Sequence, residues 1–241
     1  MLDNFRIGTA GWSIPKQQAE FFAGEGTHLE RYGQRFAAVE INSSFYRPHR
    51  PRTYERWAAS VPAGFRVAVK MPREITHQRK LAAATEPLDR FLAEIRALGD
   101  RLGPVLVQLP PSLHYAEAPV GAFFDTLRAQ FAGCVVCEPR HPTWFNGAVD
   151  ELLRRFEIGR VAADPAPAAA VPGGWPGIVY RRLHGAPRMY YSAYSAEQLD
   201  IIAQQMSAAL AGAQESWCIF DNTALGEATK DALRLLSRLA L

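Results

Sequence analysis

Short hydrophobic runs alternate with segments of helical periodicity along the chain. The runs predict strands at Phe5–Ala10, Ala38–Asn42, Phe65–Lys70, Pro104–Leu109, the start of Cys134–Trp144, Arg160–Asp164, Ile178–His184 and Ser216–Asn222. The helical segments are His28–Phe36, Thr53–Ser60, Pro87–Leu102, Val120–Phe131, Val149–Phe156, Ser195–Leu210 and Ala228–Leu239. Strands that alternate with helices favour a parallel sheet of the α/β class.

Eight such strands in 241 residues predict a (β/α)8 TIM barrel that forms one domain over residues 1–241. An open doubly wound sheet is the alternative. The segment DPAPAAAVPGGWPG, which follows the sixth strand, has four prolines and two adjacent glycines. Such a composition cannot hold a normal helix, so we expect the sixth helix to be degenerate.

Polar side chains gather where the predicted strands end. They are Trp12, Glu40, Asn42, Lys70, Gln108, Glu138, Arg140, Asp164, Arg182, His184, Asp221 and Asn222. The alternation of side chains along a strand places Arg182 and His184 on one face. Because Val67 and Val69 suit the helix side of their strand, Lys70 should point inward. Inward residues near the carboxyl ends of barrel strands form the floor of an active site.

A single charge in a barrel interior is readily explained as one half of a buried ion pair. Here the strand ends bring together seven charged residues, and isolated buried charge is costly. We therefore predict a functional pocket at the carboxyl-terminal face of the barrel. The loops add Phe45, Tyr46, Trp144, Tyr190 and Tyr194. Aromatic rings beside charges suit a site that stacks on a sugar or base while it holds an anion.

Composition limits the remaining options. The formal net charge of +3 is too small to indicate a polyanionic partner. The chain has no run of about 18 apolar residues, so we expect no membrane span. The absence of a basic-then-apolar leader and the three cysteines favour a cytoplasmic, reducing location. Cys134 and Cys137 are spaced C-x-x-C in a strand, which points them to opposite faces and favours structural thiols.

The strand-end motifs also resemble a known family. GTAGWS, EINSSFYR, FRVAVKMPREITH, QLPPS, EPRHPTW, YRRLHG, YYSAYS and FDNT are similar, in this order, to the signature segments of the domain of unknown function 72 family. The resemblance runs from Ile7 to about Leu236 and implies a TIM barrel. Barrels of the family look similar to those of endonuclease IV and xylose isomerase, which suggests nucleic-acid binding by analogy of fold alone.

The resemblance carries the polar strand-end positions other than Trp12 over onto this chain and adds His141, Trp144, Tyr190 and Tyr194 to them. Two positions depart from the family pattern. Pro139 stands where a phenylalanine usually precedes Arg-His-Pro, which could change the angle at which Arg140 leaves its strand. Ala193 replaces a common glycine, so we expect a stiffer loop there.

The first functional hypothesis is a hydrolase or lyase acting on a phosphorylated or nucleic-acid-related substrate. Lys70, Arg140 and Arg182 would hold the anion, since guanidinium groups suit phosphate. Glu138 or His184 would transfer protons. The predicted catalytic residues are Glu138, His184, Lys70, Asp221 and Glu40. The predicted substrate contacts are Trp12, Asn42, Tyr46, Gln108, Arg140, His141, Trp144, Asp164, Arg182, Tyr190, Tyr194 and Asn222.

Three alternatives stay open. A metal-dependent nuclease or sugar isomerase would bind Mn2+, Mg2+ or Zn2+ through Glu138, Asp164, His184 and Asp221, although the nearby arginines would repel the ion. A binding module for a nucleotide or single-stranded nucleic acid would need no turnover. A Schiff-base aldolase would use Lys70, but we expect the adjacent carboxylates to keep this lysine protonated. The cofactor and the oligomeric state are left undecided, and no membrane partner is expected.

Overall fold

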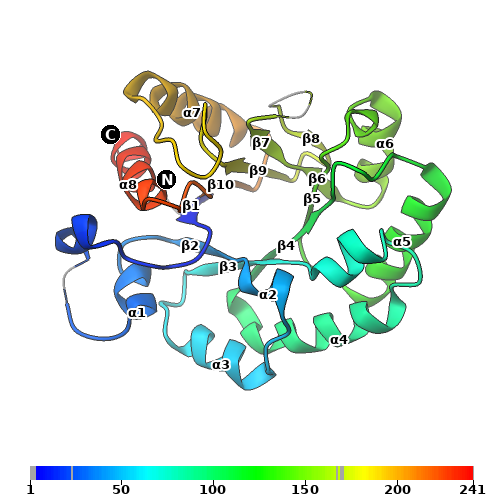
Figure 1. The fold of residues 1–241 in the computed structure, drawn as a ribbon, viewed down its shortest axis with the longest axis horizontal. Helices are drawn as coiled ribbons and strands as arrows, with labels where there is room; N and C mark the ends of the chain where they lie inside the picture. The colour runs from blue at the N-terminus through cyan, green and yellow to red at the C-terminus, as the bar shows by residue number, and fades with distance from the viewer. Residues whose placement is uncertain (1–3, 23, 167, 169–170, 241) are drawn as a thin grey trace.

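The computed structural model describes residues 4–22, 24–166, 168 and 171–240. Parallel strands surround a common centre and helices cover the outside, as Figure 1 shows. The strands are β1 (Phe5–Thr9), β2 (Ala38–Ile41), β3 (Arg66–Lys70), β4 (Leu102–Gln108), β5 (Val135–Glu138), β6 (Ile158–Arg160), β7 (Ala162–Asp164), β9 (Ile178–Leu183) and β10 (Glu215–Phe220). The predicted TIM-barrel fold is confirmed.

The hydrogen-bonded ladder of this barrel has two parts and is not closed. One part has the order β1-β10-β9-β7, and the other has the order β2-β3-β4-β5-β6-β8. The predicted sixth strand is split at Val161, so that β6 pairs with β5 and β7 pairs with β9. Between β1 and β2 the described residues form one isolated bridge, from Ala10 to Glu40. The strand order is nevertheless that of a TIM barrel.

The helices follow the strands in the expected order. They are α1 (His28–Gly33), α2 (Ser43–Tyr46), α3 (Pro51–Ala59), α4 (Thr85–Ile95), α5 (Glu117–Gln130), α6 (Gly147–Arg155), α7 (Ala196–Ala209) and α8 (Glu227–Leu239). The prediction of one helix over Pro87–Leu102 was too long. Regular helix ends at Ile95, a 3-10 segment follows, and Gly99 has φ 52°, which a continuous α-helix does not allow.

The proline-rich segment after the sixth predicted strand forms no helix in the described part of residues 165–177, as its composition predicted. This segment contains the two-residue strand β8 (Gly173–Gly174), which pairs antiparallel with β6. Gly174 has φ 67°, and a Cβ there would meet the carbonyl oxygen of Ile158 at 2.6 Å. Glycine therefore lets the chain turn back closely against β6.

Inside the barrel, Trp217 and Tyr180 stack at 5.6 Å and belong to an inner apolar cluster. Ala68 belongs to this inner cluster, whereas Val67 and Val69 pack in the layer between strands and helices. The predicted alternation along β3 is thus confirmed. No helix in the described part of the chain has the length and apolar character needed to cross a bilayer.

The three cysteines are free. Cys137 packs in the outer layer, and Cys134 packs against the inner cluster, so the two lie on opposite faces of β5 as predicted. Burial raises the pKa of Cys134 to about 12. A thiol that stays protonated at neutral pH is a poor nucleophile and metal ligand, which supports a structural role.

Candidate functional site

Arg182, on β9, is the centre of a buried ion network at the carboxyl ends of the strands. Its Nη2 donates to Glu40 Oε1 at 2.7 Å and to Asp221 Oδ2 at 2.9 Å, and its Nη1 donates to Glu138 Oε2 at 2.8 Å. Its Nε also donates to Glu40, at 3.0 Å to Oε2. Burial disfavours the charged guanidinium, but the three carboxylates outweigh it and hold the pKa of Arg182 well above its ordinary value.

Two of these carboxylates are fully buried and bound by further donors. The Tyr180 hydroxyl donates to Glu40 Oε2 at 2.8 Å. Arg140 forms an ion pair with the other oxygen of Glu138. Burial would raise the pKa of Glu138, but Arg182, His184 and Arg140 together hold it well below its ordinary value. Glu138 is therefore ionised, and it is a poor proton donor at neutral pH.

His184 lies between Asp221 and Arg140. Its Nδ1 is 3.0 Å from Asp221 Oδ2, and its Nε2 is 2.7 Å from Arg140 Nη2. Because a guanidinium can only donate, Nε2 accepts, and the network assigns the neutral tautomer with the proton on Nδ1. Asp221 accepts the hydrogen bond from this Nδ1–H, which orients the imidazole as a carboxylate does in acid–base dyads.

Lys70, the last residue of β3, differs from the other cations of the mouth. Its Nζ lies 4.2 Å from the centre of the Phe45 ring. Among the described residues no carboxylate forms an ion pair with it. Burial, and next the charge of Arg182, lower its pKa to about 8, although nearby carboxylates act in the opposite direction. Lys70 is thus mostly protonated at pH 7, as expected, but desolvation outweighs the carboxylates and brings its pKa close to neutrality.

Tyr190 also belongs to this site. Its ring meets His184 edge-on at 5.7 Å, and 44% of the residue is exposed. Its φ of 68° is unusual for a non-glycine residue, and its backbone N–H donates to the carbonyl of His184. The barrel mouth, as we use the name here, consists of Lys70, Glu138, Arg140, His184, Tyr190 and Asp221 above the buried Arg182.

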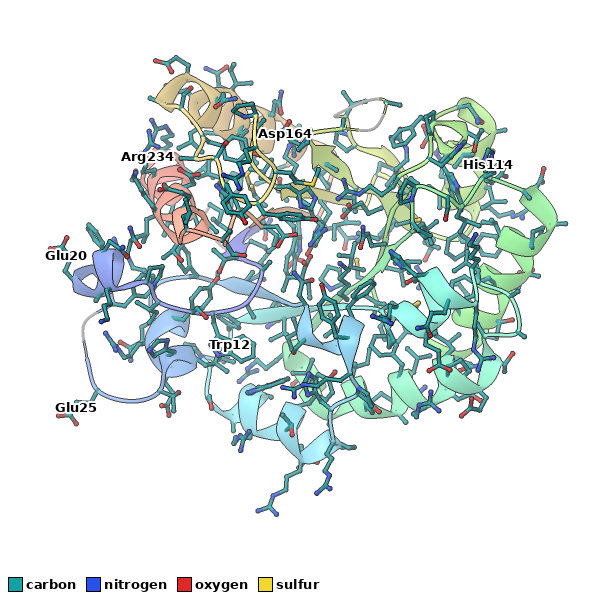
Figure 2. The ribbon with its side chains drawn as sticks, in the orientation of Figure 1. Trp12, Glu20, Glu25, His114, Asp164 and Arg234 are labelled. Carbon is teal, nitrogen blue, oxygen red and sulfur yellow. The ribbon has the colours of Figure 1, made fainter. Side chains whose placement is uncertain are left out.

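Other predicted residues lie around the mouth. Gln108 pairs with Glu138 in the ladder between β4 and β5. Trp12 packs against Trp57 at 5.1 Å, and His141 stacks on His114 at 3.7 Å. Figure 2 shows Trp12, His114 and Asp164 on separate sides of the ring of strands. Trp12, His141 and Asp164 therefore do not converge on one small ligand.

Asn42 and Tyr46 belong to the segment that follows β2. Asn42 is the residue before α2, and it accepts the backbone N–H of Phe45 through its carbonyl. Tyr46 is 71% exposed and lines a separate cavity beside the mouth.

Four residues predicted to contact substrate have structural partners instead. Trp144 is fully buried and donates its indole N–H to the carbonyl of Leu113. The Tyr194 hydroxyl donates to Asp164 Oδ2 at 2.7 Å. Asn222 is buried, and its amide donates to Asp231 and to the carbonyl of Ser192. The geometry therefore gives Trp144, Asp164, Tyr194 and Asn222 roles in packing and loop attachment, which corrects their assignment.

Arg182 also requires a correction. It was expected to hold a substrate anion, but it is 1% exposed and its donors point at three carboxylates. The metal-site alternative does not fit either. In the described ranges no three His, Cys, Asp or Glu side chains cluster in a way that could hold a metal ion. Asp164 is occupied by Tyr194, and two guanidinium groups lie between the remaining three proposed ligands.

Two residues of the site were missed in the sequence. Tyr180 lies two and four positions before Arg182 and His184, so the alternation along β9 placed it on the same inward face and could have identified it. Asp231, on α8, is fully buried and binds the backbone N–H of Tyr194. No sequence signal separates this aspartate from the other charged residues of an amphipathic helix.

The family described as "Protein of unknown function DUF72" matches residues 6–241. The chain belongs to the DUF72 family. It is 32% identical over 170 residues to UPF0759 protein YecE of Escherichia coli K12, which is 68% of this chain and 60% of that protein. It is 28% identical over 158 residues to UPF0759 protein YunF of Bacillus subtilis, which is 62% of this chain and 55% of that protein. The matched region therefore spans somewhat more than half the length of these relatives.

Solved DUF72 structures share the fold of this chain. A DUF72 family protein from Thermotoga maritima has a TM-score of 0.82 at 23% identity, covering 98% of this chain and 99% of that chain. One from Enterococcus faecalis has a TM-score of 0.82 at 20% identity, covering 98% and 96%. At these identities the likeness supports the TIM-like barrel and carries no conclusion about chemistry.

Proposed function

We propose that this DUF72 protein is an enzyme whose active site is the barrel mouth, and that it is a hydrolase or lyase acting on a small phosphorylated or carboxylated substrate. The observation that carries the proposal is Lys70. It is a mostly buried cation that forms no ion pair with any carboxylate of the described residues, and it lies beside the His184–Asp221 pair. A fold that needed only structural ion pairs would place no unpaired ammonium there, because burying one is costly.

Lys70 and Arg140 are the groups proposed to bind the anion. Arg140 is 12% exposed in its side chain and now spans Glu138 and His184. A substrate phosphate or carboxylate would offer its guanidinium a charged acceptor in place of the neutral imidazole nitrogen. His184 Nε2 would then be free to accept a proton from the substrate.

His184 is the proposed general base and, after proton transfer, the general acid. Asp221 would orient the ring and stabilise the imidazolium through the Nδ1 proton. Glu138 remains ionised and would hold Arg140 in place, so His184 suits proton transfer better than Glu138 does. Arg182 and Glu40 would keep the carboxylates of the site in position from beneath.

The test is a panel of phosphorylated sugars, nucleotides and carboxylic acids, screened for binding by calorimetry and then for turnover. Lys70→Met should weaken the binding of a compound that the wild type binds by at least about tenfold, as loss of one charge-assisted contact predicts. Lys230→Met, at an exposed helical lysine, is the matched control. Equal affinities in Lys70→Met and the wild type would refute the assigned anion site.

The lowered pKa of Lys70 favours a second candidate. An amine with a pKa of about 8 is partly neutral at physiological pH and could form a Schiff base with a carbonyl substrate. Borohydride added with a panel of aldehydes and ketones should then give a stable adduct at Lys70 in the wild type and none in Lys70→Met. Retained binding of anions without any adduct would favour the first candidate.

A further inference from the structure

Arg181, on β9, is a buried cation that lies outside the ion network of the barrel interior. Its neighbours in the strand, Tyr180 and Arg182, point into the barrel. Because side chains alternate along a strand, Arg181 points to the outer face, on the side where Leu183 packs in the outer layer. In the ladder between β7 and β9 it is paired with Ala162, whose small side chain leaves room beside it.

The surroundings of Arg181 differ from those of the other buried arginines. In the described part of the chain the buried arginines are Arg160, Arg181 and Arg182. Asp150 binds Arg160 at 2.8 Å, and three carboxylates bind Arg182. Arg181 is 6% exposed, yet it forms no ion pair with any described residue, and its Nη1 is buried without a hydrogen-bond partner there.

This arrangement is unfavourable for Arg181 in the free protein. Burial lowers the pKa of its guanidinium, and no carboxylate of the described residues offsets that effect. A guanidinium nevertheless stays protonated in proteins, so it cannot escape the cost of burial by losing its charge. An anion supplied from outside would provide the missing partner.

A cavity of about 170 Å3 lies beside Arg181, between β7, β9 and α7. We call it the β7–α7 cavity. Figure 1 shows α7 beside β7 and β9. The proline-rich segment after β7 forms no helix in its described part, so α7 is the helix that lines this cavity. A cavity of roughly 150 Å3 can hold a molecule of the size of benzene, so a compact ligand fits here.

The wall of the β7–α7 cavity is largely apolar. Leu183 and Ile202 form its base, and Ile201 carries its most accessible part, since 53% of that residue is exposed. The polar residues that α7 contributes are Gln198 and Gln205, which are uncharged. Such a wall suits the hydrocarbon or aromatic part of a ligand, because burying that part releases water.

Among the described lining residues Asp164 is the one carboxylate, and it lies further along the strands. The ladder pairs Asp164 with Leu183, two residues beyond the pair of Ala162 and Arg181. Two residues correspond to about 7 Å along a strand. Asp164 Oδ2 accepts the Tyr194 hydroxyl at 2.7 Å. The cavity therefore favours an anion at Arg181 and a body short enough to stop before Asp164.

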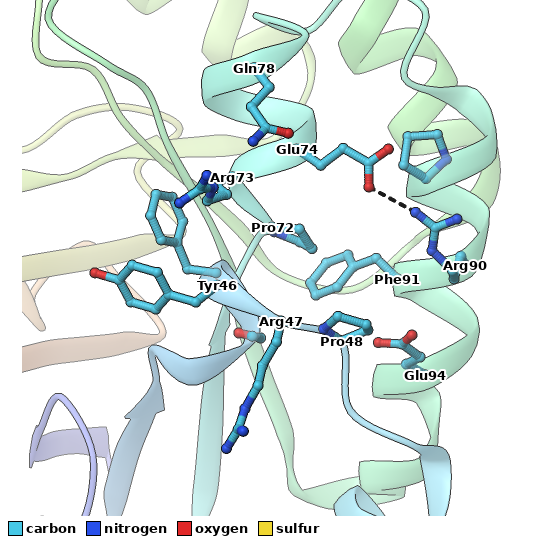
Figure 3. Close-up of a pocket in the computed structure, with 13 residues that line it drawn as sticks. Tyr46, Arg47, Pro48, Pro72, Arg73, Glu74, Gln78, Arg90, Phe91 and Glu94 are labelled. Carbon is cyan, nitrogen blue, oxygen red and sulfur yellow. Dashed lines mark hydrogen bonds and ion pairs between the residues drawn. The ribbon is translucent and has the colours of Figure 1, made fainter.

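The larger cavity that Tyr46 lines offers no such buried cation. Its volume is about 460 Å3, and Figure 3 shows Arg90 bound to Glu74 on its wall, at 2.8 Å. The side-chain oxygen of Gln78 accepts from Arg73 at 3.3 Å. These charged side chains have partners within the protein, whereas Arg181 has none among the described residues.

We propose that the β7–α7 cavity binds a small monocarboxylate with a compact apolar body, such as an aromatic or branched-chain carboxylic acid. Its carboxylate would accept hydrogen bonds from the Arg181 guanidinium, and its body would pack on Ile201 and Ile202. One negative charge matches one guanidinium, whereas a phosphate dianion would require a second cation, which the described lining lacks. This site lies on the outer face of the strands and does not depend on the reaction proposed at the mouth.

Benzoate, benzamide and acetate test the proposal in a protein-observed NMR titration of the full chain. Benzoate carries both the charge and the body, benzamide carries the body alone, and acetate carries the charge with almost no body. Benzoate should bind tightest and shift the methyl signals of Ile201, Ile202 and Leu183. Benzamide should bind at least about tenfold more weakly, because it loses a charge-assisted contact. Acetate should also bind at least about tenfold more weakly, because it buries less apolar surface.

Arg181→Met should weaken benzoate by about tenfold and leave benzamide within about twofold of the wild type. Arg155→Met, at an exposed arginine of α6, is the matched control and should bind benzoate as the wild type does. Lys70→Met should change the affinity for benzoate at the Ile201 methyl signal by less than about twofold, which separates this site from the mouth. If Arg181→Met does not fold, the comparison of benzoate with benzamide on the wild type decides.

Three results would overturn the proposal. The first is equal affinity of benzoate and benzamide at the α7 methyl signals. The second is equal affinity for benzoate in folded Arg181→Met and Arg155→Met. The third is the absence of any shift at Ile201 and Ile202 with benzoate at millimolar concentration, whether or not the signals of Tyr190 at the mouth respond.

Discussion

Arg182 and Lys70 are both cations at the inner ends of barrel strands, yet their surroundings are opposite. Arg182 donates to three carboxylates, and its pKa is raised. Lys70 contacts the face of an aromatic ring, and its pKa is lowered to about 8. A buried charge that is bound by carboxylates helps to hold the strands together, whereas a buried charge without an ion pair lowers the stability of the fold. We therefore distinguish the floor of the site, formed by Arg182 and its three carboxylates, from Lys70, which is proposed to contact the ligand.

Replacing Arg182 by Met should destabilise the protein by about 3–5 kcal/mol, because Glu40, Glu138 and Asp221 would be left buried without their shared cation. Urea denaturation of Arg182→Met and of Arg188→Met, at an exposed arginine, measures the difference. A loss below about 1 kcal/mol would mean that the floor is not held by this ion network.

Replacing Tyr180 by Phe removes the hydroxyl that donates to Glu40 and keeps the ring that stacks on Trp217. The expected loss is about 1.5–3 kcal/mol, the usual cost for a buried hydrogen bond to a charged group. Tyr191→Phe, at a partly exposed tyrosine, is the control in the same denaturation experiment. If both variants unfold at the wild-type denaturant concentration, Tyr180 does not support the floor.

Replacing Lys70 by Met should have the opposite sign and stabilise the protein by about 1–3 kcal/mol at pH 7. The lowered pKa means that the folded state disfavours the charged ammonium relative to the unfolded chain, and Met fills a similar volume without a charge. Stabilisation combined with loss of ligand binding is the behaviour expected of a functional residue. A destabilised Lys70→Met would contradict the comparison.

The pH dependence of that difference follows from the same shift. The pKa of Lys70 is about 8 in the folded state and near the ordinary 10.5 in the unfolded chain. The unfolded state therefore binds more protons between these values, so the stability of the wild type should rise with pH across this window. The advantage of Lys70→Met should be fully present below pH 8 and shrink toward pH 10.5. A constant difference from pH 7 to pH 10 would contradict the lowered pKa.

The sequence allowed the barrel and the inward direction of most strand ends to be predicted, because alternation and element order are local signals. The sequence did not reveal which charged side chains form ion pairs with one another. Glu40 and Arg182 are 142 residues apart, and their pairing depends on side-chain conformations inside the barrel. Trp144 and Tyr194 were predicted to contact a ligand because aromatic loop residues often do. In the structure Trp144 donates to the carbonyl of Leu113 and Tyr194 donates to Asp164, so both side chains have partners within the protein. The apolar pattern of α4 continued past Ile95, where the regular helix ends, and gave no sign of the 3-10 segment that contains Gly99.

The central claim is that Lys70, which has no ion-pair partner among the described residues, is an amine of lowered pKa that binds an anion, and its own titration tests this most directly. The chain has four lysines, so selective 13Cε labelling gives few signals, and Lys70→Met assigns the one of interest. We predict a pKa of about 8 for Lys70 in the free protein and a higher value when inorganic phosphate is added, because an anion stabilises the ammonium form. An ordinary lysine pKa that does not respond to phosphate would contradict the account.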